Sequence, residues 1–172
     1  MKNASSLTMS PSNLNIMNEI NIADEESTLT FTQGTNNNKI TGDGTLIIKD
    51  VIVNNALIHD KKTIITQNST LENNSTITGS IDNKGIITGS GELKLTGNSI
   101  TENDIKNKMS LVYDTKNNQK ATLTIGNSEG NVITLTNDIV SDNQELVSET
   151  ICSLYLIISK FGKRLFINNI II

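Results

Sequence analysis

The chain has 172 residues and a net charge of −4, its aromatic content is 3%, and it has no tryptophan. It has no cluster of lysine and arginine with interleaved aromatic residues, which argues against a nucleic-acid-binding domain. The single cysteine, Cys152, excludes an internal disulfide framework and a cysteine-rich metal site. Because large aromatic side chains usually dominate a compact core, their scarcity favours thin stacked layers of aliphatic residues.

The first segment, residues 1–26, is polar. Its start, Met1–Met9, lacks the apolar stretch of a signal peptide. Pro11, followed by Ser12 and Asn13, indicates a turn or the start of one short helix. We expect residues 1–26 to form a polar leader. No run of about 18 apolar residues occurs in the chain, so no transmembrane helix is expected.

The pattern changes at Ser27. Leu29 and Phe31 alternate with threonines, which is the period of a β-strand. From there to about residue 140, short aliphatic runs are separated by Asn, Asp, Lys or Gly. Short strands at steady spacing are typical of a sandwich, a barrel or a β-solenoid.

A repeated motif favours the solenoid. Ile40–Ile48 reads ITGDGTLII, Ile87–Leu95 reads ITGSGELKL, and Ile77–Ser80 is a partial copy, ITGS. Such self-similarity is the signature of stacked repeats. The sequence therefore predicts an all-β fold, a right-handed parallel β-helix or β-solenoid over residues 27–140. Asn side chains at equivalent turns are expected to form amide ladders. The aliphatic residues expected to face inward are Ile40, Leu46, Ile48, Ile87, Leu93 and Leu95.

The last segment, residues 141–172, is an apolar tail that lacks the motif. One helix face is predicted from the spacing of Val147, Ile151, Leu154, Tyr155 and Ile158. We expect a short helical or strand-like appendage, with a helix over Gln144–Lys160. An open solenoid end needs covering, so this segment is predicted to fold back as a cap. A tail produced by a frameshift is the alternative interpretation.

Few residues are candidates for chemistry. His59 precedes Asp60, but neighbours in a strand point to opposite faces, so His59–Lys62 is interpreted as a solvated turn. Asp43 lies between two glycines, as in calcium-binding repeats, yet Ser90 takes its place in the second copy of the motif. Cys152 has no histidine near it in sequence. We therefore predict no catalytic, cofactor-binding or metal-binding residues and no cofactor.

The repeats, the Asn-rich turns and the bias toward Ile, Asn and Lys resemble autotransporter passenger domains, in particular the surface cell antigens of rickettsiae. The resemblance covers roughly residues 27–137. Such proteins carry a signal peptide and a C-terminal β-barrel that anchors them in the outer membrane, and their passengers are commonly right-handed β-helices that bind host surfaces. Neither the signal peptide nor the barrel pattern is present here, so the resemblance implies a fragment.

The resemblance implies a non-enzymatic structural or adhesive solenoid located at the cell surface or outer membrane. Its partner would be a host-cell surface protein or glycan, with no nucleic acid and no membrane-spanning segment in this chain. Expressed as it stands, without a signal peptide, the chain would be cytoplasmic. Two alternatives remain open. The first is a β-helix enzyme acting on polysaccharide, which needs clustered carboxylates or basic residues on one face of the solenoid. The second is an unrelated cytoplasmic β protein, which would also lack a signal peptide.

Overall fold

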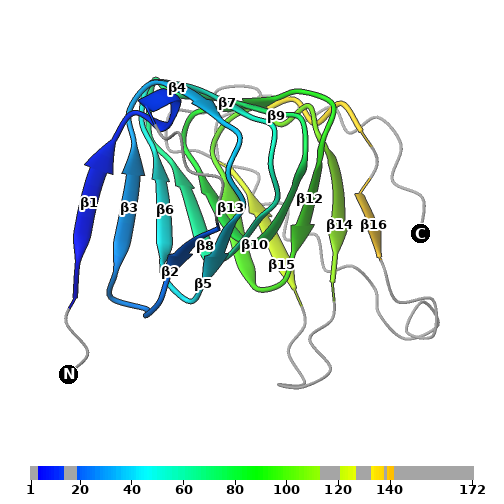
Figure 1. Ribbon diagram of the computed structural model, residues 1–172. Helices are drawn as coiled ribbons and strands as arrows, with labels where there is room; N and C mark the ends of the chain where they lie inside the picture. The colour runs from blue at the N-terminus through cyan, green and yellow to red at the C-terminus, as the bar shows by residue number, and fades with distance from the viewer. Residues whose placement is uncertain (1–3, 14–18, 113–120, 127–132, 138, 142–172) are drawn as a thin grey trace.

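The computed structural model describes residues 4–13, 19–112, 121–126, 133–137 and 139–141. The chain is an all-β, parallel β-solenoid of about six turns (Figure 1). This confirms the fold class expected from the repeats. The predicted helix over Gln144–Lys160, its role as a cap and Cys152 all lie outside the described residues.

The elements are short. One 3₁₀ turn, η1, spans Pro11–Asn13. The strands are β1 (Ser6–Met9), β2 (Ile20–Ile22), β3 (Thr28–Phe31), β4 (Gly34–Asn36), β5 (Ile40–Gly42), β6 (Thr45–Ile48), β7 (Val51–Asn54), β8 (Ile58–Ile65), β9 (Thr70–Asn73), β10 (Thr76–Asn83), β11 (Ile86–Thr88), β12 (Glu92–Leu95), β13 (Asn98–Thr101), β14 (Lys108–Leu111), β15 (Thr122–Ile125) and β16 (Ile139–Ser141).

Each coil crosses three faces in the same order. Face A contains β2, β5, the first half of β8, the first half of β10, β12, β14 and β16. Face B contains β1, β3, β6, the second halves of β8 and β10, β13 and β15. Face C contains β4, β7, β9 and β11 and continues through the bridges from Ile87 to Ile105 and from Ile105 to Leu135.

We number the coils from the first that crosses all three faces. Coil 1 is β2–β4, coil 2 is β5–β7, coil 3 is β8–β9 and coil 4 is β10–β11. Coil 5 contains β12, β13 and Ile105, and coil 6 contains β14, β15 and Leu135. The strand β1 and the turn η1 precede coil 1, and β16 follows coil 6.

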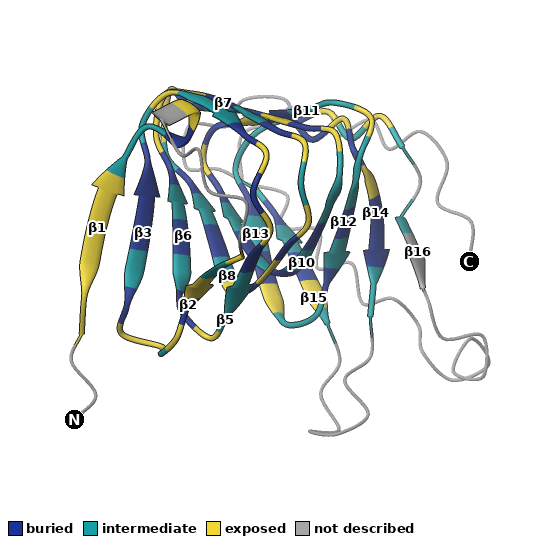
Figure 2. Cartoon of the chain, viewed as in Figure 1, coloured by how far each residue is buried: buried dark blue, intermediate teal, exposed yellow. Residues whose placement is uncertain are grey.

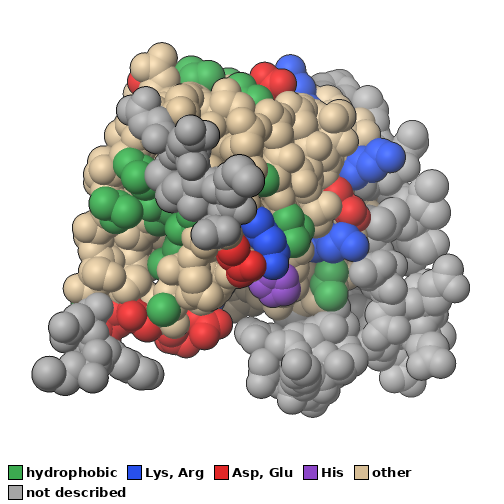
Figure 3. Space-filling view, in the orientation of Figure 1, with side chains coloured by type: hydrophobic (Ala, Val, Ile, Leu, Met, Phe, Trp, Pro, Cys, Tyr) green, Lys and Arg blue, Asp and Glu red, His purple; other side chains and the backbone are tan. Residues whose placement is uncertain are grey.

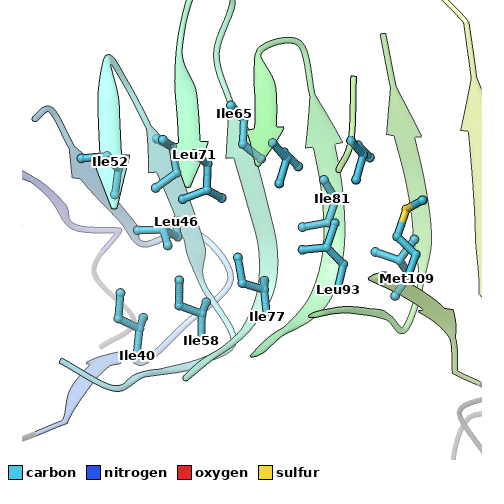
Figure 4. Close-up of a cluster of buried hydrophobic side chains, with 14 of the residues drawn as sticks. Ile40, Leu46, Ile52, Ile58, Ile65, Leu71, Ile77, Ile81, Leu93 and Met109 are labelled. Atoms are coloured by element: carbon cyan, nitrogen blue, oxygen red, sulfur yellow. The ribbon is translucent and has the colours of Figure 1, made fainter. Parts of the chain in front are cut away.

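The core is a set of aliphatic columns that run along the solenoid axis. On face A, Ile40, Ile58 and Ile77 pair in register, and Leu93 and Met109 continue the same column. Figure 4 shows these side chains stacked from coil to coil. Parallel strands that bury one side chain in two produce such columns because residues in register point the same way.

The predicted inward residues are confirmed. All six, from Ile40 to Leu95, are 1% exposed or less. Burial alternates residue by residue along strands such as β10, with intermediate and buried positions in turn (Figure 2). Full burial of one such side chain contributes about 1.5–3 kcal/mol, so the columns provide the main apolar stabilisation of the fold.

The N-terminal segment that was expected to be a leader contributes to the stack. In β1, Ser6–Met9 pairs with Thr28–Phe31, and in β2, Ile20–Ile22 pairs with Ile40–Gly42. The turn η1 packs beside β4, where the Thr35 backbone N–H donates to Ser12 Oγ at 2.9 Å. Each of these strands carries only two alternating apolar residues, which is too short a pattern to read from sequence.

Candidate functional site

The corner between faces A and B is built around a β-bulge. His59 pairs with Thr78 and Lys62 pairs with Ser80, so Asp60 and Lys61 together oppose Gly79. An extra residue on one strand bends it, and here the bend lets β8 pass from face A to face B. The interpretation of His59–Lys62 as a solvated turn is therefore wrong, because these residues lie within a strand.

Asp60 is buried inside this bulge and is 3% exposed. The Thr63 hydroxyl lies 2.9 and 3.1 Å from its two carboxylate oxygens, and the backbone N–H of Leu46 also bonds to it. Burial raises the pKa of Asp60 to about 7, although these hydrogen bonds oppose the shift. Gly79 closes the site with φ at +151°, where an added Cβ would lie 2.4 Å from the Asp60 carbonyl oxygen.

His59 lies on the outside of the same corner. It is exposed, whereas Asp60 points inward, so the two neighbours form no catalytic dyad. Figure 3 shows the histidine on the surface among basic and acidic side chains. Lys61 forms an ion pair there with Glu25, and Lys62 Nζ lies 3.2 Å from Asp82 Oδ2. This corner therefore has a sealed carboxyl inside and solvated ion pairs outside.

Asp43 is exposed in its turn, and so is Ser90 at the equivalent place in the second copy. Across the described part of the chain, no group of three His, Cys, Asp or Glu side chains gathers in a way that could hold a metal ion.

The corner between faces C and A carries a buried amide ladder. Asn36, Asn54 and Asn73 follow one another in successive coils and are all 0% exposed. Asn36 Nδ2 donates to Asn54 Oδ1 at 2.8 Å, and Asn54 Nδ2 donates to Asn73 Oδ1 at 2.9 Å. Each amide also donates to the backbone carbonyl two residues ahead of it. The expected amide ladder is confirmed.

Coil 4 interrupts this ladder because Gly89 takes the place of asparagine. Gly89 has φ at +101°, and an added Cβ would lie 2.3 Å from the Asn73 carbonyl oxygen. Asn107 of coil 5 reaches across the gap and donates to that oxygen at 2.9 Å and to the Gly91 carbonyl at 2.9 Å. Its own Oδ1 is buried without a partner, because coil 4 supplies no amide to donate to it.

A second ladder lies outside the first, on the surface. Asn55 Nδ2 donates to Asn37 Oδ1 at 3.1 Å, and Asn74 Nδ2 donates to Asn55 Oδ1 at 3.3 Å. All three side chains are exposed. We call Asn37, Asn55 and Asn74 the amide edge. It presents one amide per coil at the spacing of neighbouring strands, about 4.8 Å.

The amide edge borders face C, whose four strands β4, β7, β9 and β11 carry little charge on their outer surface. Val51 and Ile86 are 50% and 38% exposed there, and Glu72 is the one charged side chain that points outward from its described strands. The outward residues of these four strands are Thr35, Val51, Val53, Thr70, Glu72, Ile86 and Thr88. Asp104 and Lys106 flank the buried Ile105 in the next coil. The sequence reasoning did not identify this surface, although the Asn-Asn pairs that end β7 and β9 were a visible signal.

No family model, curated protein or solved structure matches this chain. Among the described residues, no helix has the length and apolar character needed to cross a membrane.

Proposed function

We propose that this chain is a non-enzymatic adhesive β-solenoid, a fragment of a bacterial surface antigen of autotransporter type. The observation that carries the proposal is the surface made of face C and the amide edge. It joins exposed β-branched side chains such as Val51 and Ile86 to a row of exposed amides. Such a surface offers apolar contact together with regularly spaced donors and acceptors.

The geometry favours an extended partner that lies along the solenoid axis. Each coil repeats the same kind of contact one strand spacing further along. A glycan or an extended polypeptide on a host-cell surface would meet Asn37, Asn55 and Asn74 in succession. The strands β4, β7, β9 and β11 expose one charged side chain, Glu72. A partner that lies on these strands should therefore bind with a weak dependence on salt, because few screened charge pairs contribute.

The non-enzymatic part of the proposal is supported by the separation of the candidate groups. The Asp60 carboxyl is enclosed by Thr63, Gly79 and the backbone of Leu46, so a polymer on the surface does not reach it. His59 faces solvent on the other side of the strand. A general acid or base has to lie within hydrogen-bond reach of the reacting group, so Asp60 and His59 cannot act together on one substrate.

A binding experiment with a matched control tests the proposal. Labelled protein is added to cultured animal cells and to a glycan array, and saturable binding is measured. Val53→Glu places a charge at the centre of face C, whereas Thr45→Glu places the same charge on the outer side of face B. We expect Val53→Glu to weaken binding by about tenfold or more and Thr45→Glu to leave it unchanged.

Absence of saturable binding by the wild-type protein, or equal losses in the two variants, would refute the adhesive role. Turnover of a polysaccharide by the wild-type protein would support the enzymatic alternative instead. The autotransporter origin is tested separately by the flanking DNA, where we expect a sequence that encodes a β-barrel in the same or a shifted frame.

A further inference from the structure

The strand β1 forms one edge of the large sheet. Within the described chain it pairs with β3 and with no other strand. Leu7 is in register with Leu29 and Leu46 and so belongs to a core column, yet it is 53% exposed. Among the described residues, the end of the apolar core is therefore open at β1, which lies at the left of Figure 1.

The backbone of β1 has a defined free side. Ser5 and Met9 use their carbonyls toward β3, accepting from the Thr28 and Thr32 N–H groups at 2.8 and 3.0 Å. Alternate residues of a parallel strand bond to opposite sides. Ser6 and Thr8 therefore turn their N–H and C=O groups toward the free edge. No other described strand pairs with these four backbone groups, so they can bond to a further strand.

This edge has none of the usual features that block strand addition. Proteins protect exposed edges with charged side chains, proline or bulges. The strand from Ser6 to Met9 has no charge and no proline, and its pairing with β3 is unbroken. Two copies of β1 can therefore face each other without like charges meeting across the new pair.

We propose that two copies of this chain associate end to end by antiparallel pairing of β1 about a two-fold axis centred on Leu7. Ser6 of each copy then lies opposite Thr8 of the other, and these two residue pairs exchange the four free backbone hydrogen bonds. Leu7 lies opposite Leu7 of the second copy in a non-hydrogen-bonded pair, where side chains are closest. Directly opposed residues point to the same side of a sheet, so the two open cores meet.

The two-fold arrangement is favoured over the addition of copies in one direction. An antiparallel pair uses the same edge in both copies, closes after two subunits and leaves no free β1 edge. The strand is also self-complementary in this register, since Leu7 contacts its own equivalent and a hydroxyl-bearing residue lies opposite another. Ser6–Met9 of a second copy therefore matches both the free backbone groups and the exposed Leu7.

Sedimentation equilibrium of the whole chain tests the proposal. The wild-type protein is expected to show a reversible monomer–dimer equilibrium. Leu7→Lys, which places two like charges opposite each other at the centre of the interface, should raise the dimer dissociation constant by about tenfold or more. Leu57→Lys changes a leucine that is 39% exposed and lies away from β1, and it should leave the equilibrium unchanged.

Cross-linking keeps the proposal testable if Leu7→Lys misfolds. In a Cys152→Ser background, Leu7→Cys should form a disulfide-linked dimer under mild oxidation, because opposed side chains of such a pair have Cβ atoms about 5 Å apart. Leu57→Cys is the matched control and should remain monomeric. A monomeric wild-type protein at every concentration, assemblies that grow beyond the dimer, or equal cross-linking of the two cysteine variants would overturn the proposal.

Discussion

The two corners that flank face A solve the same problem in different ways. Both must turn the chain sharply while keeping buried polar groups bonded. The corner with Asn36, Asn54 and Asn73 uses a neutral amide in successive coils, and each amide is the hydrogen-bond partner of the next. The corner with Asp60 buries one carboxyl, and Gly42 and Gly79 occupy the equivalent positions in the coils before and after it.

The difference follows from what each group can do when it is repeated. An amide has both a donor and an acceptor, so a column of asparagines satisfies itself. An ionised carboxylate only accepts, so a column of aspartates would place unpaired like charges in contact. A neutral amide can therefore recur in successive coils of a solenoid, whereas an ionisable buried carboxyl is tolerated in one coil without a second beside it.

The largest expected effect is the loss of stability at the Asp60 corner as the pH rises. The folded-state pKa of Asp60 is raised to about 7 from an ordinary value of 3.8. Its contribution to stability is then fully present below the unfolded pKa and is lost as pH rises through the folded pKa. Compared with Asp60→Asn, the wild-type protein should lose on the order of 4 kcal/mol between about pH 4 and about pH 8.

Urea denaturation of both proteins across this pH range measures the effect. Because Asp60→Asn leaves every other titratable group in place, the difference between the two curves isolates Asp60. Equal pH profiles for the two proteins would contradict the assignment of a neutral buried carboxyl.

A substitution of Gly89, which takes the place of asparagine in the buried ladder, should have the next largest effect on the free energy of unfolding. Gly89→Ala adds a Cβ that would lie 2.3 Å from the Asn73 carbonyl oxygen, on a backbone with φ at +101°. The Asn73 backbone or that of residue 89 has to move, so a loss of about 3 kcal/mol is expected in the free energy of unfolding. Gly97→Ala is the control, because its nearest neighbour is Ser80 Cβ at 3.7 Å, and it should change stability by less than about 1 kcal/mol.

Removing one member of the buried ladder should cost less. Asn54→Ala deletes the donor to Asn73 and the acceptor for Asn36, which leaves a buried amide on each side without its partner. Each orphaned buried group is costly, so a total loss of about 2 kcal/mol is expected. Thermal unfolding monitored by circular dichroism provides the measurement, and a variant as stable as the wild type would show that the ladder adds little.

A substitution in the exposed ladder should have the smallest effect on the free energy of unfolding. Asn55→Ala removes the bonds to Asn37 and Asn74, but all three side chains are exposed and water replaces those bonds. A change below about 0.5 kcal/mol is expected. If Asn55→Ala destabilised the protein as much as Asn54→Ala, the distinction between a structural inner ladder and an outer binding edge would be lost.

The features that repeat locally were predictable from the sequence. Ile40, Leu46 and their counterparts in the second copy were expected to face inward because the same spacing recurs, and all are buried. The burial of Asp60 was not predictable. It depends on the bulge opposite Gly79, which lies in the next coil and is distant in sequence. The role of β1 was equally hidden, since Leu7 and Met9 alone give too short a period to recognise.

The hydrogen bonds that Asn107 makes across coil 4 affect how the coils of the solenoid unfold locally. In most of a solenoid each repeat contacts only its neighbours, so it can fray one coil at a time. The bonds from Asn107 to Asn73 and Gly91 link coils 3, 4 and 5 directly. Coil 5 cannot detach without breaking a hydrogen bond to coil 3 as well as those to coil 4, so these three coils should exchange their amide hydrogens as one cooperative block.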